Sequence, residues 1–306
     1  MKGTESPSAA SNGTTAITRS IVVARKECTH AVRSSTLRLL IAVLLLVTVV
    51  AFRGAGGSGA APSPLLAVDV LALLLQVIVP IAAILVGCLT LAGERESGSL
   101  RFLFGLAPSR TEVVFGKFLG TIGVLAATLG VTFVFAVPLS YFMFGAVAIG
   151  ALAGLALTTM LLAGAFVGFA IGVSAIAASR KQSIAAAVSG YMLVTFLWEP
   201  VVAGAHYAVT GTLPDGALPA WLLFLERLNP LEAYAAAAGA IGVENVHPLR
   251  ITFGLLGGGT GRSIPDGSGT TAPIYLADGV AICILIGWML VPTLIGLVWF
   301  RRVDLA

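Results

Sequence analysis

Six long apolar runs, separated by polar segments, constrain the fold more than any other feature of the sequence. A helix needs about 20 predominantly apolar residues to cross the hydrocarbon core of a bilayer. Only 10% of the residues are charged and 58% are hydrophobic, whereas soluble domains are about 25% charged. The sequence therefore predicts an all-α polytopic membrane protein with six transmembrane helices. The expected spans are residues 37–52, 70–92, 118–142, 147–178, 183–204 and 279–300.

The distribution of Lys and Arg predicts the orientation, because cytoplasmic loops are enriched in these residues. With both termini in the cytoplasm, only four of the 18 Lys and Arg residues lie outside: Arg53, Arg227, Arg250 and Arg262. We therefore expect a multi-pass protein of the cell membrane with a long outer loop, residues 205–278. Its two apolar islands, before and after residue 243, are expected to lie against the outer membrane surface. A re-entrant seventh span is the alternative.

The segment before the first span divides into two parts. Residues 1–16 are polar and contain Ser, Thr and Gly, so we expect a disordered tail. From Ile17 onward, apolar residues recur at helical spacing, while Arg19, Lys26 and Arg33 recur on another side. This pattern predicts an amphipathic helix in the inner membrane interface, with an ordinary cytoplasmic helix as the alternative. No cleavable signal peptide is expected, because the first apolar run begins only near Leu37.

The sequence offers little for catalysis or metal binding. The three cysteines lie far apart and form no CxxC pair, and neither His206 nor His247 has a catalytic motif near it. The stretch LLGGGTGRS, residues 255–263, departs from the phosphate-loop pattern at two positions. We expect no enzyme, metal site, cofactor or nucleic-acid surface on this chain. Glu199, between Trp198 and Pro200, is interpreted as an outer-interface residue, with a place in a substrate path as the alternative.

Three glycines in the fourth span predict close helix packing. Gly164, Gly168 and Gly172 recur every four residues, and small residues at this spacing let another helix approach closely. The partner helix is either in the same subunit or in the second subunit of a dimer.

The most charged part of the chain is a polar cassette, residues 93–117, which reads GERESGSLRFLFGLAPSRTEVVFGK. After the flexible, charged start, a short amphipathic piece presents apolar and aromatic side chains until Pro108 ends it. Ser109 and Glu112 then have the S-x-x-E form of a capping box and are expected to begin the helix that becomes the third span. The cassette is predicted to be a cytoplasmic helix that a partner could bind. A loop lying on the lipid headgroups is the alternative.

This cassette resembles the signature of ABC-2 type permease subunits, most closely the branch grouped with multicopper-enzyme maturation permeases. One departure is Phe104, which stands where the second Leu of a pair is usual. The six spans, the helix before them and LNPLEAY before the last span are also similar, so the resemblance extends over residues 17–306. The matching cassette positions are Glu94, Arg95, Gly98, Ser99, Leu100, Leu103, Pro108, Ser109, Arg110, Gly116 and Lys117.

The resemblance implies a permease subunit of an export-type ABC transporter. It would pair with a second permease, identical or not, and with cytoplasmic ATPase subunits that hold ATP and Mg. Phe102, Leu103 and Phe104 would dock on the ATPase, and Arg180 and Lys181 would form a second cytoplasmic contact. Arg101 and Arg110 would face acidic ATPase residues. The implied coupling residues are Glu94, Arg95, Gly98, Ser99, Leu100, Arg101, Phe102, Leu103, Phe104, Pro108, Ser109, Arg110 and Lys117.

Two other classes remain open at this point. A secondary transporter or channel working without ATP normally has polar or charged residues at mid-membrane, and these spans have almost none. A polytopic membrane enzyme would need a catalytic constellation. The cargo stays open between copper-related, lipid, peptide and drug substrates. The methionines outside the N-terminus lie on four different spans and suggest no soft-metal path.

Overall fold

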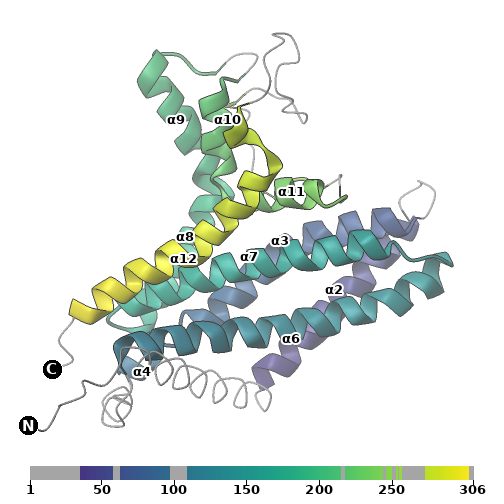
Figure 1. Cartoon of the computed structure of the whole chain (residues 1–306), viewed down its shortest axis with the longest axis horizontal. Coiled ribbons are helices and arrows are strands. Elements are labelled where there is room, and N and C mark those ends of the chain that lie inside the picture. Colours follow the sequence, from purple (N-terminus) through teal and green to yellow (C-terminus); the bar gives the residue numbers. More distant parts are fainter. Residues whose placement is uncertain are drawn as a thin grey trace, which may run out of the picture.

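The computed structural model describes residues 35–57, 63–96, 109–214, 218–243, 246–249, 253, 255–256 and 273–302, and within them every regular element is a helix. Six helical stretches are long and apolar enough to cross a membrane, which confirms the predicted all-α class and the six spans. The elements (Figure 1) are α2 (Ser35–Gly57), α3 (Pro64–Gly87), α4 (Ala92–Glu96), α6 (Arg110–Phe144), α7 (Ile149–Ile176), α8 (Arg180–Met192), η1 (Leu193–Leu197), α9 (Trp198–Thr210), α10 (Ala220–Arg227), α11 (Pro230–Ala240), η2 (Ile274–Leu276) and α12 (Asp278–Arg302).

Local capping explains why two spans begin earlier than their apolar runs. The hydroxyl of Ser109 accepts a hydrogen bond from the backbone N–H of Glu112 at 3.2 Å, and the Glu112 carboxylate accepts one from the N–H of Ser109 at 2.8 Å. This is the predicted capping box, and it is confirmed. At the start of α3, Ser63 caps the N–H of Leu66 at 3.1 Å, and Pro64 occupies the first turn, where a missing N–H costs nothing.

The fifth span is a broken helix. It comprises α8, the π-helical segment η1 and α9. Pro200 lies in the first turn of α9, where its ring removes one backbone donor and crowds the carbonyl four residues earlier. A local widening into a π turn just before the proline accommodates this crowding. In Figure 1, α9 extends away from the bundle toward α10, against which it packs.

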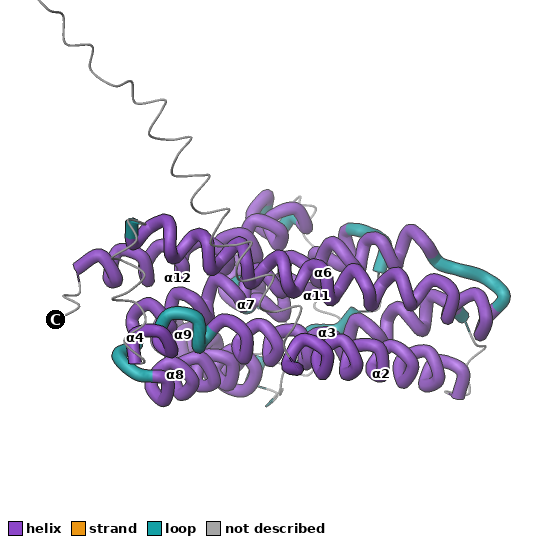
Figure 2. Tube along the Cα trace, turned by 90° about the horizontal axis from the view of Figure 1, so that it is seen from below, coloured by secondary structure: helices purple, strands orange, loops and turns teal. Residues whose placement is uncertain are grey.

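The helix α7 is the centre of the bundle and packs against α12, α3, α6 and α11. Figure 1 shows α3, α6 and α7 running alongside one another, with α12 crossing α7. The first span, α2, packs against α3 and α6, and Figure 2 shows α2 and α3 side by side. Most of the α7 core positions are small or aliphatic, and these side chains let four neighbours contact one helix.

The glycines of α7 face α12 of the same chain. A Cβ atom at Gly164 would lie 2.8 Å from the sulfur of Met289. At Gly168 it would overlap the backbone of Met289, and at Gly172 the carbonyl of Pro292. The threonine hydroxyl of Thr293 also donates to the carbonyl of Gly168 at 3.2 Å. The ladder therefore serves packing within one subunit, a choice that the spacing alone left open.

The helix α11 is buried, although we expected this part of the outer loop to lie on the membrane surface. Leu231 and Tyr234 are 0% exposed, and α11 packs between α7 and α12. The Tyr234 hydroxyl lies 3.2 Å from Thr159 Oγ1, about 15 Å along α7 from its first residue at a rise of 1.5 Å per residue.

Candidate functional site: the ends of the polar cassette

The structure describes the two ends of the cassette, Gly93–Glu96 and Ser109–Lys117. The predicted docking residues Phe102, Leu103 and Phe104 lie outside the described residues. The same holds for the remaining predicted coupling residues of the middle part, which are Gly98, Ser99, Leu100, Arg101 and Pro108. We call the end of the bundle where α4, the start of α6 and the end of α12 meet the cassette end. The opposite end is the loop end.

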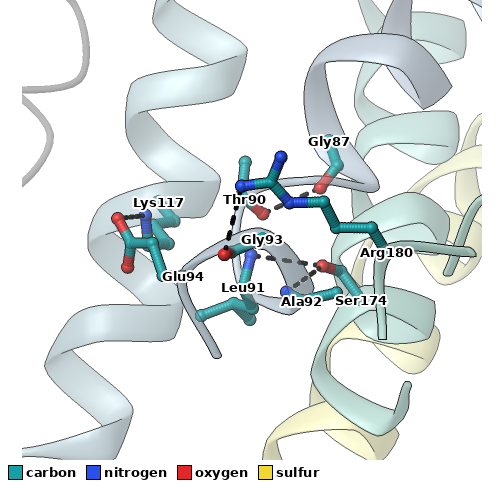
Figure 3. A network of polar contacts seen from close by, with 9 residues as sticks. All are labelled: Gly87, Thr90, Leu91, Ala92, Gly93, Glu94, Lys117, Ser174 and Arg180. Carbon is teal, nitrogen blue, oxygen red and sulfur yellow. Dashed lines mark hydrogen bonds and ion pairs between the residues drawn. The ribbon is translucent and has the colours of Figure 1, made fainter. Parts of the chain in front are cut away.

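Glu94 and Lys117, two predicted ATPase contacts, bind each other. Lys117 Nζ lies 2.8 Å from Glu94 Oε1 (Figure 3). The Lys117 side chain is only 3% exposed and that of Glu94 is 33% exposed. A buried ammonium group is stable only beside an opposite charge or hydrogen-bond acceptors. The pair therefore ties α4 to the third span, and the Lys117 side chain lies inside the protein.

The turn between α3 and α4 is bound to the fourth span. The backbone N–H groups of Leu91 and Ala92 donate to the hydroxyl of Ser174 at 3.2 and 3.0 Å (Figure 3). Ser183 of α8 donates its hydroxyl to the carbonyl of Cys88 at 2.5 Å. These two serines satisfy backbone groups that a continuous helix would have satisfied itself. Neither serine was predicted from the sequence, in which the only available signal was a hydroxyl near the end of an apolar run.

Arg180, predicted as a second ATPase contact, holds α4 from the other side. Its backbone N–H donates to Glu96 Oε2 at 2.8 Å, and its guanidinium Nη2 approaches the carbonyl of Gly93 at 3.4 Å. The Glu96 carboxylate thus sits at the N-terminus of α8, where the helix dipole favours negative charge. Lys181, the other predicted contact, is exposed in the first turn of α8.

Arg110 binds the end of the sixth span. Its Nη1 donates to the carbonyls of Phe300 and Arg301 at 2.7 and 3.1 Å, and its guanidinium carbon lies 5.8 Å from the centre of the Phe300 ring. Carbonyls at a helix C-terminus lack intrahelical partners and attract cations. In return, Arg301 donates to the hydroxyl of Thr111 at 2.7 Å. The guanidinium that we expected to face a partner is thus engaged within the chain.

These contacts connect the cassette mechanically and offer no reaction chemistry. Glu94 links it to the third span, Gly93 and Glu96 link it to the fifth, and Arg110 links it to the sixth. Within the part of the chain that the structure describes, no three His, Cys, Asp or Glu side chains gather as a metal site would require. A displacement of the cassette would therefore reach three membrane helices at once.

A comparison with known families identifies the class of this protein. The sequence profile of the ABC-2 family transporter proteins matches residues 21–305. A comparison with curated proteins gives no match. The family match extends from the segment before the first span to beyond the end of the last one. The chain therefore belongs to the ABC-2 family of transporter proteins and is a multi-pass membrane permease of the ABC-transporter type.

Proposed function

We propose that this permease is one subunit of an export-type ABC transporter, and that residues 94–110 of the cassette couple it to a separate ATPase subunit. The observation that carries the proposal is that polar contacts hold both ends of the cassette in the bundle. Glu94 binds Lys117 of the third span, and Arg110 binds the end of the sixth. A segment held in this way transmits a push or pull to the bundle. A loop resting on lipid would need no such linkage.

The proposed mechanism uses this linkage. ATP and Mg bind on the partner ATPases, whose closure moves the two coupling segments of a permease pair toward each other. Each permease then tilts as its third, fifth and sixth spans follow the cassette, and the central path changes from inward to outward access. ATP drives this change only because it binds one arrangement more tightly than the other.

The orientation proposed here places the cassette end in the cytoplasm, with both termini on that side of the cell membrane. The contacts at this end involve a cluster of basic residues: Arg110, Lys117, Arg180 and Arg301. An excess of Lys and Arg on one side is typical of the cytoplasmic face. The ATPase, which needs cytoplasmic ATP, would dock on the same face.

A secondary transporter or channel is the second candidate, and the observation that favours it is the burial of Gln76 and Glu199 inside two spans. In transporters driven by ion gradients, such residues contact ions or substrate. Here both side chains form hydrogen bonds with the backbone of the outer loop. These hydrogen bonds account for the burial of Gln76 and Glu199 without an ion or a substrate. We therefore prefer the ATP-driven transporter.

The test is co-purification of ATPase activity with the full-length chain, extracted in detergent from its native membrane. The wild type is compared with Phe102→Asp/Leu103→Asp, which places two charges on the predicted docking surface. The matched control is Val209→Asp/Leu213→Asp, at exposed apolar positions at the end of the fifth span. We expect ATPase activity with the wild type and the control and its loss with the cassette variant. A well-folded wild type that brings down no ATPase would contradict the proposal.

A further inference from the structure

Two polar side chains are fully buried inside membrane spans far from the cassette. Gln76 lies in α3 and is 0% exposed, and Glu199 lies in the first turn of α9 and is 1% exposed. Burial of an amide or a carboxylate is costly unless hydrogen bonds replace the lost water. The hydrogen-bond partners of Gln76 and Glu199 therefore show which part of the chain these two side chains stabilise.

Gln76 binds one outer segment through its backbone. Its Nε2 donates to the carbonyl of His247 at 2.9 Å, and its Oε1 accepts from the N–H of Leu249 at 2.8 Å. The amide of Gln76 thus forms one bond as a donor and one as an acceptor, as the backbone of a neighbouring strand would. The side chain of Val246, next to this contact, is buried at 7% exposure, whereas that of His247 is exposed.

Glu199 binds the next part of the outer loop in the same way. Its Oε2 accepts from the N–H of Phe253 at 2.6 Å, and its Oε1 accepts from those of Leu255 and Leu256 at 2.8 and 3.3 Å. Leu256 is 2% exposed and packs on a small apolar cluster that includes Val202 of α9.

The second span, which carries Gln76, and the fifth span, which carries Glu199, contact each other directly at the cassette end. Ser183 of the fifth span bonds Cys88 at the end of the second, and Arg180 holds α4 just beyond it. At a rise of 1.5 Å per residue, Gln76 lies about 18 Å from Cys88 along the second span. By the same measure, Glu199 lies about 24 Å from Ser183 along the fifth span. The helix α3 packs against α8 but barely against α9, so at the loop end the bonds of Gln76 and Glu199 connect the two spans through the outer loop.

We propose that Gln76 and Glu199 form an outer clasp, which holds the second and fifth spans together at the loop end and releases during transport. The inference rests on the proposed function, because movement of the cassette would swing both spans about their direct joint. Gln76 and Glu199 bind only backbone groups of the outer loop. These hydrogen bonds can therefore break and re-form without a particular loop side chain. The π segment directly before α9 is a place where α9 can change direction relative to α8.

The first test asks whether the two contacts act as one unit. Reporters are Val246→Cys and Leu256→Cys, each in the full chain with its three native cysteines replaced by alanine, labelled from outside with a membrane-impermeant maleimide. Glu199→Ala should raise labelling at Leu256→Cys and also at Val246→Cys, each by about tenfold, the effect of losing a buried hydrogen bond on local opening. Gln76→Leu should raise labelling at Val246→Cys, next to its own contact. It should also raise labelling at Leu256→Cys, next to the contact of Glu199.

Two further variants make this result interpretable. Glu199→Gln keeps one acceptor oxygen and should give a smaller increase, which protects the test against misfolding of the alanine variant. Thr128→Val removes a buried hydroxyl that bonds only within its own helix, to Val124 at 2.8 Å, and should leave both labelling rates unchanged. If Glu199→Ala exposes Leu256→Cys but not Val246→Cys, the contacts are independent and the clasp is refuted.

The second test asks whether the clasp releases during transport. Labelling of Val246→Cys is compared in the complex with its ATPase, without nucleotide and with ATP plus vanadate, and we expect an increase of about tenfold. An active complex with unchanged labelling would leave the proposed function intact and refute release of the clasp. If no ATPase associates at all, the proposed function fails, while the first test still decides whether the clasp exists.

Discussion

Lys117 of the third span and Glu94 of α4 form an ion pair of 2.8 Å that closes the start of the cassette against the bundle. The cation of this pair is almost completely buried, whereas the anion is about one third exposed. The two partners therefore differ in what their loss leaves behind. Removal of the anion leaves a buried positive charge, but removal of the cation leaves a carboxylate on a side chain that is one third exposed.

This asymmetry gives the first prediction. Glu94→Gln should lower the unfolding free energy by about 1–3 kcal/mol, less than for a fully buried pair because Glu94 is partly solvated. Lys117→Met should cost less, and the double variant should cost less than the sum of the two single changes. Thermal unfolding in detergent, followed by size-exclusion chromatography, measures all three. Equal losses for both single variants with simple additivity would show that the pair does not act as described.

The second prediction concerns the glycines of α7. Gly168→Ala places a Cβ where the backbone of Met289 lies, so the fourth and sixth spans must separate. Overpacking of this kind costs about 1–3 kcal/mol. Gly150→Ala is the matched control on the same helix, because nothing lies within 4 Å of its added Cβ. We expect a clear drop in melting temperature for the first variant and none for the second. A similar small change in both would mean that α7 and α12 do not pack this closely.

The third prediction concerns the end of the sixth span. Arg110→Ala removes two hydrogen bonds to the carbonyls of Phe300 and Arg301. Charged hydrogen bonds contribute about 1.5–3 kcal/mol each, so the last turn of α12 should open more often and trypsin should cleave it at least about tenfold faster. Arg53→Ala, at an exposed position in α2, is the control. If cleavage after Arg301 is equally fast in the wild type, in Arg110→Ala and in Arg53→Ala, Arg110 does not stabilise this helix end.

The fourth prediction tests the burial of the α10–α11 junction. The indole N–H of Trp288 donates to the carbonyl of Leu228 at 2.8 Å, and its ring packs edge-to-face on Phe169. Trp288→Phe keeps an aromatic ring but loses the hydrogen bond, which should destabilise the protein by about 1–3 kcal/mol. Trp299→Phe, at a position that is 54% exposed, should change the melting temperature little. Indistinguishable melting curves would argue against this junction being packed on α12.

The fifth prediction tests the orientation. In the chain without native cysteines, Lys181→Cys lies in the exposed first turn of α8, and Leu213→Cys lies just beyond α9. With the cassette end in the cytoplasm, an impermeant maleimide added to intact cells should label Leu213→Cys. It should label Lys181→Cys only after the membrane is opened. The reverse pattern would invert the topology and place the cassette out of reach of a cytoplasmic ATPase.

The sequence by itself determined the features that depend on neighbouring residues. The six spans follow from apolar length, because the bilayer requires about 20 such residues wherever they occur in the chain. The capping box of Ser109 and Glu112 joins residues three positions apart, so its pattern is visible in the sequence. The cassette signature also identified the family that the profile match over residues 21–305 confirms.

Only the tertiary structure decided which distant groups meet. Arg110 and Phe300 are 190 positions apart, and Glu199 and Phe253 are 54 positions apart. A charged residue near a span end has many candidate partners in sequence, including water and other proteins, and residue type does not choose among them. The choice follows from helix packing: α12 crosses α7 at its glycines, and this crossing brings the end of α12 to Arg110. For that reason, four residues predicted to contact a partner, Glu94, Arg110, Lys117 and Arg180, also join parts of the permease to one another.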